Sequence, residues 1–363
     1  METMSSAHDP LEKQVVDNRY RLLRRVGSGG MSLVYLAERL GIGKPIAIKF
    51  LRSAFASLPD FVSRFEQEAR ACSRLNHLNC VSVIDFGVAF GSPYLVMEYV
   101  HGTLLSVALR GTLELDRSVG ITRQILAGLR HAHARGVIHR DLKPGNVMLV
   151  EMTGAADFVK IMDFGTAQIL TGDAAERHQL GTDVGTPWYM SPEQAAGQPT
   201  DARTDIYALG VMLFEMLTGE RPFVADDPMR VLQMHLHSPI PSVRVLRPEL
   251  GISPELELVL VKALQKRAED RFDSAEAFDS ALQAIPELRR RRATPPVKPA
   301  EPAPPVSPED SSEEDDAPPA SITPVITAEL RRSKRRRRWL LPLVALAVAG
   351  AALAVAAALL MLR

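Results

Sequence analysis

The sequence predicts an α+β fold of two lobes, a small sheet-rich lobe followed by a larger helical one. Short β-branched runs separated by Gly and Pro fill residues 20–100. Longer helical patterns dominate after Gly102. The composition then changes abruptly at the four arginines of 289–292. We therefore expect one folded domain over residues 20–285, followed by segments of a different kind.

The expected elements of the small lobe follow one another closely. RLLRRVG, MSLVYLAER and KPIAIKFL are typical of strands. DFVSRFEQEARACSRL has apolar residues at helical spacing and predicts a helix. VSVIDFGVAF and PYLVMEYV return to strand character. Residues 1–19 are polar and aperiodic, and they predict a flexible N-terminal arm.

In the larger lobe, DRSVGITRQILAGLRHAHARG and TDIYALGVMLFEMLTG predict long helices. After them, residues 286–330 are rich in proline and acidic side chains, and residues 293–330 carry a net charge of −7. Such a composition cannot bury enough apolar surface to fold, so we expect a disordered linker.

The charge balance excludes some classes of function. Although the whole chain is formally neutral, residues 1–288 carry a net charge of −5, which argues against a nucleic-acid binder. The two cysteines, Cys72 and Cys80, are too few for a disulfide framework and predict reduced core thiols of a cytosolic domain. The N-terminus lacks the basic and apolar regions of a secretory signal.

The stretch GSGGMSLVYL, residues 27–36, lies between two expected strands. Its glycines permit a tight turn whose backbone N–H groups can approach phosphates. It lacks the Gly-Lys-Ser/Thr ending of a P-loop, and a strand follows it, so a dinucleotide-binding fold is disfavoured. Glycine-rich hairpins are common, and the stretch alone does not decide the function.

Lys49 lies in an expected strand with apolar neighbours on both sides, and Glu68 follows on the next helix. One interpretation is an edge-strand lysine that extends to solvent. The other is a lysine held over the phosphates of a nucleotide and paired with Glu68.

The stretch VIHRDLKPGNVMLV, residues 137–150, decides between these interpretations. Asp141 is suited to accept or orient a hydroxyl proton, and Asn146 offers an oxygen to a hard cation. Lys143 offers a positive charge to a transferring phosphoryl group. IMDFGTA follows with Asp163, a second candidate ligand for Mg²⁺. GTPWYMSPEQ and TDIYALGVMLFE come next.

Together these motifs resemble the protein kinase family, and within it the bacterial eukaryotic-like serine/threonine kinases. The resemblance runs from Tyr20 to about Ile285, with every motif in order and flanked by apolar strands or helices as expected. It implies a two-lobed protein kinase fold that uses ATP and Mg²⁺.

The resemblance also implies the roles of individual residues. Those that would contact the nucleotide are Gly27, Ser28, Gly29, Gly30, Val34, Ala47, Lys49, Met97 as gatekeeper, and Glu98 to Val100 as hinge. Asp141 would be the catalytic base, assisted by Lys143, Lys49 and Glu68, and the metal ligands would be Asn146 and Asp163. The supporting residues would be the stacked pair His139 and Phe164, the ion pair Glu193–Arg271, and Asp205 beneath the catalytic loop.

Two positions depart from the commonest family pattern, Ser32 in the glycine-rich loop and Ser191 in MSPEQ. Both are small residues, so neither puts activity in doubt. His131 and His133 are two residues apart and do not share a helix face, which disfavours a metal site.

Lys143 is the choice of serine/threonine-directed members, and the resemblance pairs it with Thr186. Arg140 often accompanies phosphorylation of the activation segment, for which Thr171 and Thr182 are candidates. The alternative is that Thr171 and Thr182 are ordinary loop hydroxyls. We expect protein substrates and self-association for autophosphorylation between molecules.

The C-terminus predicts a membrane anchor. The 24 residues of 339–362 are uncharged, long enough as a helix to cross a bilayer. Seven cations within 331–338 precede them, which predicts a polybasic juxtamembrane segment and a cytoplasmic kinase domain at the cell membrane. The alternatives to a membrane-anchored kinase are a kinase-fold scaffold with little catalysis and a small-molecule phosphotransferase.

Overall fold

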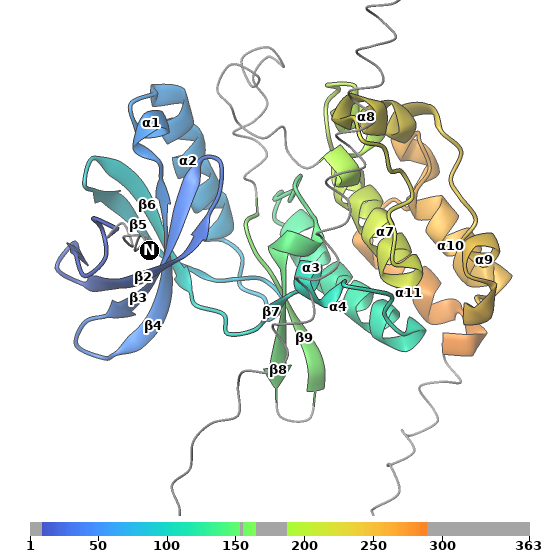
Figure 1. The fold of residues 1–363 in the computed structure, drawn as a ribbon, viewed down its shortest axis with the longest axis horizontal. Helices are drawn as coiled ribbons and strands as arrows, with labels where there is room; N and C mark the ends of the chain where they lie inside the picture. The colour runs from blue at the N-terminus through green and yellow to red at the C-terminus, as the bar shows by residue number, and fades with distance from the viewer. Residues whose placement is uncertain (1–8, 153–154, 165–186, 289–363) are drawn as a thin grey trace, which may run out of the picture. The chain divides into compact units, whose positions relative to one another are not determined.

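The computed structural model describes residues 9–152, 155–164 and 187–288 (Figure 1). These residues form the two lobes that the sequence predicts, a curled sheet with two helices and a larger body of helices. The expected linker, the polybasic segment and the 339–362 span lie outside the described residues. Among the residues that are described, no helix is long and apolar enough to cross a bilayer.

The small lobe is built on a six-stranded antiparallel sheet with the order β1-β2-β3-β4-β6-β5. Its strands are β1 (Val15–Val16), β2 (Tyr20–Ser28), β3 (Ser32–Arg39), β4 (Lys44–Leu51), β5 (Val83–Ala89) and β6 (Ser92–Glu98). Its helices are α1 (Ser53–Ala56) and α2 (Pro59–Cys72). Every strand and the long helix expected from the sequence in this lobe are present.

Alternation along β4 separates two apolar clusters. Ile46, Ile48 and Phe50 pack into one cluster with Tyr35 and Tyr94 on one face of the sheet. Leu51, on the opposite face, packs against Phe55 of α1, Phe65 of α2 and their neighbours. Because side chains alternate along a strand, Lys49 lies on the same face as Leu51, toward α2. The strand pattern therefore fixes the side from which Lys49 projects.

Residues 9–19 differ from the expected arm. Val15 and Val16 pair with Arg21 and Tyr20 to form the edge strand β1, and Val16 is fully buried. The Tyr35 hydroxyl donates to the Asp9 carboxylate at 3.0 Å. A strand of two residues is too short to produce a periodic pattern, which is why the sequence did not reveal it.

The larger lobe contains most of the helices and one small sheet of order β7-β8-β9. Its helices are α3 (Leu105–Ala108), α4 (Leu115–His133), α6 (Pro192–Ala195), α7 (Arg203–Thr218), α8 (Pro228–His237), α9 (Val243–Leu246), α10 (Pro254–Ala263) and α11 (Ala275–Ala284). Its strands are β7 (Thr103–Leu104), β8 (Val147–Met152) and β9 (Ala155–Ile161), and its 3₁₀ turns are η1 (Pro144–Asn146), η3 (Pro187–Tyr189), η4 (Pro248–Leu250) and η5 (Ala268–Asp270).

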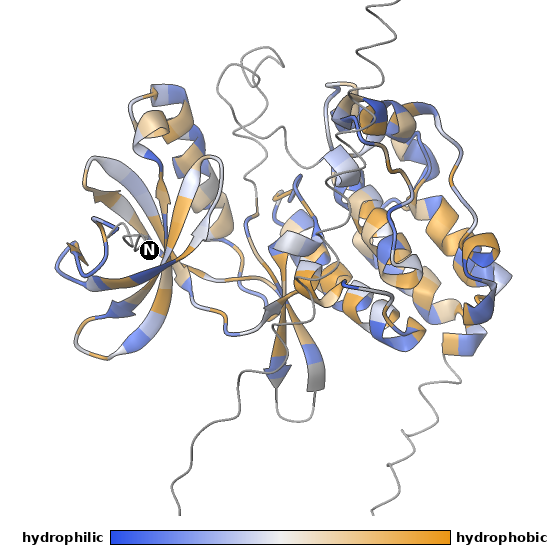
Figure 2. Ribbon diagram, viewed as in Figure 1, coloured by the Kyte–Doolittle hydropathy of each residue, from blue (hydrophilic) through white to orange (hydrophobic). Residues whose placement is uncertain are grey.

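Helix α7 forms the centre of this lobe. Nearly all of its residues are buried, and the hydrophobic colour runs along most of its length in Figure 2. It packs against α4 and α10, and it ends at Gly219, whose left-handed backbone (φ 81°) lets its N–H cap the Glu215 carbonyl. A helix buried on all sides provides a rigid base for the loops around it.

The folded domain ends slightly later than predicted. Leu288 is buried, and Glu287 accepts a hydrogen bond from the Ser253 hydroxyl at 2.9 Å. Residues 286–288, expected to begin the linker, therefore belong to the folded body. Cys72 and Cys80 are buried, as expected of core thiols.

Candidate active site

One face of the six-stranded sheet in the small lobe carries residues that are predicted to contact a nucleotide. Val34 lies directly opposite Lys49, and Ala47 lies opposite Met97. Because directly opposed residues project to the same side, and Ala47 and Lys49 are two apart, all four side chains share one face. The register therefore brings together residues from three strands that the sequence could only place on separate elements.

The glycine-rich stretch forms the turn between β2 and β3. Gly27 pairs with Val34, and the Gly29 N–H donates to the Ser32 carbonyl at 2.9 Å. This geometry confirms the predicted hairpin, and Gly30 lies at its tip. Ser32 accepts this hydrogen bond through its backbone, so its departure from the family glycine leaves the turn intact.

The segment predicted as a hinge leaves β6 at Glu98 and continues through Val100 without regular structure. The Glu98 side chain is already engaged, since Oε1 accepts from Lys160 Nζ at 2.7 Å and from the Ser82 N–H at 2.8 Å. These contacts link the end of β6 to β9 of the larger lobe. This link could not be predicted from the sequence, because Lys160 lies 62 residues further along the chain.

In the predicted catalytic loop, within residues 137–150, two polar side chains surround the carboxylate of Asp141. Lys143 Nζ lies 2.8 Å from Asp141 Oδ2. Asn146 Nδ2 donates to the Asp141 carbonyl at 2.8 Å and to Oδ2 at 3.2 Å. Asp141 is thus held in position by a cation and an amide. Only β8 flanks this loop as a strand, because residues 137–139 before it have no regular structure, contrary to the expectation from the sequence.

Asp205 supports the backbone of this loop from beneath. Its two carboxylate oxygens accept from the His139 and Arg140 N–H groups, each at 2.8 Å, and His133 Nε2 lies 2.7 Å from Oδ2. Burial alone would raise the pKa of Asp205, but the His133 hydrogen bond and these donors outweigh it, so its pKa lies below the usual value. Arg140 has a positive φ of 63°, a conformation that these contacts hold in place.

The two lobes meet at an ion pair. Lys49 Nζ donates to Asp163 Oδ1 at 3.0 Å. Burial opposes ionisation of Asp163, but the charge of Lys49 prevails and holds the pKa of this carboxyl below its usual value. Lys49 is 6% exposed, which contradicts the alternative of an edge-strand lysine extending to solvent. Glu68, its predicted partner, belongs to α2, and its side chain lies outside the described residues.

His139 and Phe164 stack as the resemblance implies, with ring centroids 4.8 Å apart. His139 Nε2 lies 2.8 Å from the Met162 carbonyl. The Cys72 thiol, on α2, donates to the Phe164 carbonyl at 3.2 Å. This last contact ties the helix of the small lobe to the segment that carries Asp163, a role for Cys72 beyond the packing predicted for it.

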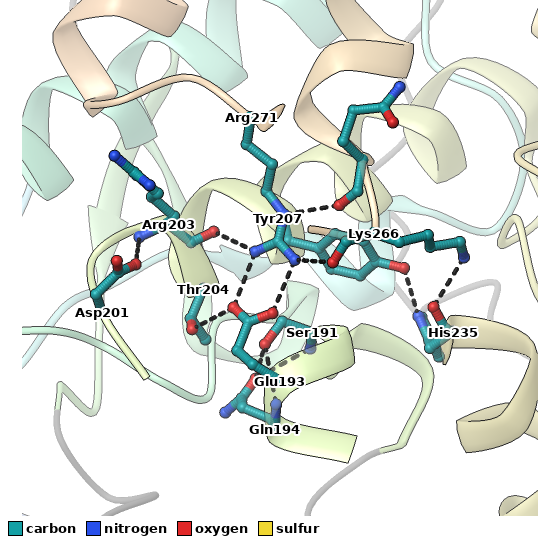
Figure 3. A network of polar contacts seen from close by, with 11 residues as sticks. Ser191, Glu193, Gln194, Asp201, Arg203, Thr204, Tyr207, His235, Lys266 and Arg271 are labelled. Carbon is teal, nitrogen blue, oxygen red and sulfur yellow. Dashed lines mark hydrogen bonds and ion pairs between the residues drawn. The ribbon is translucent and has the colours of Figure 1, made fainter. Parts of the chain in front are cut away.

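Glu193 and Arg271 form a buried, two-pronged ion pair (Figure 3). The two guanidinium nitrogens donate to the two carboxylate oxygens at 2.8 and 2.7 Å, and Thr204 adds a third hydrogen bond at 2.8 Å. Burial opposes ionisation of Glu193, yet Arg271 lowers its pKa below the usual value. The predicted ion pair is therefore confirmed as a brace between α6 and the segment that precedes α11.

Residues 187–194 are held in place by contacts with several elements. The Arg221 guanidinium lies 4.5 Å from the centre of the Trp188 ring, and the Tyr189 hydroxyl donates to Glu215 Oε2 at 2.6 Å. Ser191 and Gln194 form a capping box at the start of α6. Ser191 is therefore a helix cap, which explains why serine is suitable there.

Two contacts of the catalytic loop were not foreseen. The Arg140 Nε donates to the Thr200 hydroxyl at 3.1 Å, and the Arg140 carbonyl accepts from Gln194 Nε2 at 2.7 Å. No sequence signal marks Thr200, which lies 60 residues away. The candidate phosphorylation sites Thr171 and Thr182 lie outside the described residues, as does Thr186.

Comparison with known proteins agrees with this geometry. The family model "Protein kinase domain" matches residues 20–282. The serine/threonine-protein kinase pkn3 of Myxococcus xanthus is 43% identical over 287 residues, covering 78% of this chain and 52% of that protein. PknB of Mycolicibacterium smegmatis is 36% identical over 352 residues, covering 92% and 54%. The kinase domain of Mycobacterium tuberculosis PknI superimposes with a TM-score of 0.60 at 27% identity, over 78% of this chain and all of that domain.

The chain therefore belongs to the protein kinase family, and its domain is of the bacterial serine/threonine type. The chain spans about half the length of the two curated relatives described above.

Proposed function

We propose that this chain is an ATP- and Mg²⁺-dependent serine/threonine protein kinase that transfers the γ-phosphoryl group of ATP to protein hydroxyls. The observation that carries the proposal is the Asp141 carboxylate, held between Lys143 and Asn146, in a molecule whose Lys49–Asp163 pair joins the two lobes. Such an arrangement supplies a base and fixed charges for phosphoryl transfer.

The chemistry of the donor set fits a hard divalent cation. Asp163 offers a carboxylate, and Asn146 uses its amide nitrogen on Asp141, so its amide oxygen is the atom suited to a cation. The two residues are held close together, because the Met162 N–H donates to the Asn146 carbonyl at 2.9 Å. Mg²⁺ bound there would neutralise charge on the phosphates.

Asp141 has the role of orienting the acceptor hydroxyl and taking its proton. Lys143 contacts Asp141 Oδ2, the oxygen that also accepts from Asn146. From this position it is close enough to place its charge beside the transferring phosphoryl group. These roles need no rearrangement of the loop, because Asp205 and Asn146 already fix its backbone.

We infer autophosphorylation at Thr171 or Thr182 from the position of Arg140 beside the catalytic base. We also infer that residues 339–362 anchor the kinase domain at the cytosolic face of the membrane, supported by their uncharged length and the cations that precede them.

The test of catalysis incubates the full chain in detergent with labelled ATP and Mg²⁺, beside Asp141→Asn, and maps the label by mass spectrometry. We expect label on Thr171 or Thr182 in the wild type and a loss of about 10²- to 10⁴-fold in the variant. Absence of label on folded protein that binds ATP would instead favour the alternative, a membrane scaffold with little catalysis.

The membrane proposal has a separate test. Deleting residues 339–362 is expected to move the protein from the membrane fraction to the soluble fraction, while deleting 293–330 leaves it in the membrane. If the first deletion does not change fractionation, the anchor proposal fails.

A further inference from the structure

The glycine-rich turn that would cover the phosphates is made of residues with little intrinsic preference for one conformation. Gly27, Gly29 and Gly30 occur within four positions. Glycine has the largest conformational freedom of any residue, so a turn of this kind is ordered only when other groups hold it. In this structure such a group is the side chain of Arg52, which directly follows β4.

Arg52 is the residue between β4 and α1, and its backbone is fixed on both sides. The Arg52 N–H donates to the Met31 carbonyl at 2.8 Å. The Arg52 carbonyl accepts from the Phe55 and Ala56 N–H groups at 2.9 and 3.0 Å, which makes it the residue that begins α1. The side chain therefore starts from a rigid position, three residues after Lys49.

The Arg52 guanidinium reaches the two residues that precede the tip of the turn. Its Nε donates to the Gly29 carbonyl at 2.9 Å, and its Nη2 donates to the Ser28 hydroxyl at 2.7 Å. Two donors of a planar, rigid fork thus engage adjacent residues, and a lysine could not reproduce this geometry.

The other side of the turn is held by packing. Met31 is half-buried and packs against the cluster of Leu51, Phe55 and Phe65. Together with the hydrogen bond between its carbonyl and the Arg52 N–H, this contact fixes the residue that follows Gly30. Arg52 therefore orders the turn from Ser28 to Met31 as a unit.

We propose that Arg52 is a positioning residue for the phosphates of ATP. It orders the glycine-rich turn before ATP binds, so that backbone N–H groups near the tip of the turn, beyond the Gly29 N–H that donates to Ser32, can contact the phosphate chain. The proposal rests on the proposed function, since it assumes that ATP binds beneath the turn. Its physical basis is preorganisation, because a turn that is already ordered loses less conformational entropy on binding.

The test compares the full chain in detergent with Arg52→Gln and Arg52→Lys by calorimetric titration with Mg-ATP and, separately, with adenosine. Arg24→Gln, an exposed arginine on β2, is the matched control. We expect Arg52→Gln to weaken ATP binding about tenfold, to leave adenosine binding unchanged, and to leave the unfolding temperature close to that of the wild type. The control is expected to match the wild type in all three.

Arg52→Lys separates position from charge. If Arg52 acts by ordering the turn, the lysine variant should lose most of the ATP affinity that the glutamine variant loses. If the lysine variant binds ATP like the wild type, Arg52 acts as a nearby charge and the proposal is overturned. Equal weakening of ATP and adenosine would also overturn it, because the effect would not concern the phosphates.

A double-mutant cycle with Ser28→Ala gives a second readout. Because Nη2 of Arg52 donates to the Ser28 hydroxyl, the effects of Ser28→Ala and Arg52→Gln on ATP affinity should not add. Additive effects would contradict the proposal. A wild type that binds adenosine and ATP equally weakly would count against the proposed function itself, whereas wild-type ATP binding with no effect of Arg52→Gln counts only against this inference.

Discussion

A single buried carboxylate, Asp205, determines the backbone conformation beside Asp141, the proposed catalytic base. It accepts from two consecutive N–H groups, those of His139 and Arg140, and Arg140 is held in a left-handed conformation (φ 63°) that arginine rarely adopts. The conformation that aims Asp141 is thus stabilised from α7 as well as by Asn146 of the loop itself.

We predict that Asp205→Asn lowers kcat by at least about 100-fold and destabilises the fold by about 2–4 kcal/mol. The amide keeps one acceptor oxygen, so one of the buried N–H groups or His133 loses its partner. Activity assays and urea unfolding measure the two effects. Asp279→Asn is the control, because the half-buried pair of Asp279 on α11 with Arg123 on α4 is worth about 1 kcal/mol or less. Equal effects of the two variants would contradict this role.

Among the individual site residues, those that belong to contiguous motifs could be predicted from the sequence. Asp141, Lys143 and Asn146 lie within six positions, so their proximity was assured. The contacts of Arg52 and Thr200 could not be predicted, because their partners are 24 and 60 residues away and a single arginine or threonine carries no pattern.

Among the elements, α8 has the most unusual buried group. His235 is fully buried, with Nδ1 2.8 Å from the Tyr207 hydroxyl on α7 and no hydrogen-bond partner for Nε2 within the described residues (Figure 3). Burial, more than the nearby charge of Lys266, lowers its pKa to about 4. The ring therefore stays neutral in the folded protein near neutral pH.

This predicts that stability falls as the pH falls from 6.5 toward 4. In this range the unfolded chain protonates His235 and the folded chain does not, so the unfolded state binds more protons. His235 alone contributes a slope of up to about 1.4 kcal/mol per pH unit and a total loss of about 3 kcal/mol between pH 6.5 and 4. Urea unfolding between pH 7.5 and 5 measures it.

His235→Asn is the informative variant for this slope. Burial also lowers the pKa of His77 and His131, so part of the slope remains without His235. The variant should be less stable at pH 7 but show a shallower decline toward pH 5. A slope identical to that of the wild type would show that His235 is not the group responsible.

The long elements were predictable and the short ones were not. Strands β2 to β6 and helices α2, α4 and α7 could be predicted from the length and spacing of their apolar runs. Strands β4 and β6 and helix α7 have nearly continuous apolar runs because they are buried on more than one face. Strand β1 has two residues and η3 has three, too few for any period, and both depend on tertiary contacts.

The folded part of the chain extends beyond the residues that the family model matches. The match begins at residue 20, but Val16 is fully buried, Leu11 packs against the same cluster, and Asp9 accepts from Tyr35. Burial, reinforced by Asp9, raises the pKa of Tyr35 to about 12. The N-terminal residues therefore complete the small lobe.

We predict that deleting residues 1–19 from the full chain destabilises it by at least about 3 kcal/mol, because it removes the buried Val16 and several hydrogen bonds, among them those of Tyr35 to Asp9 and of Tyr94 to Asp17. Asp9→Ala should lose only about 1 kcal/mol of this. Thermal unfolding of the three proteins measures the series. Equal unfolding temperatures would mean that these residues contribute nothing to stability.

The separation of Asp205 from the loop that it holds also bears on how the protein is made. His139 and Arg140 precede Asp205 by 66 and 65 residues. A chain is synthesised from its N-terminus, so the loop leaves the ribosome long before α7 exists to hold it. Without that support, the left-handed backbone at Arg140 has no reason to form. A nascent chain that stops before α7 is therefore expected to be catalytically inactive. We expect phosphorylation to begin only after the helical lobe has been translated and folded.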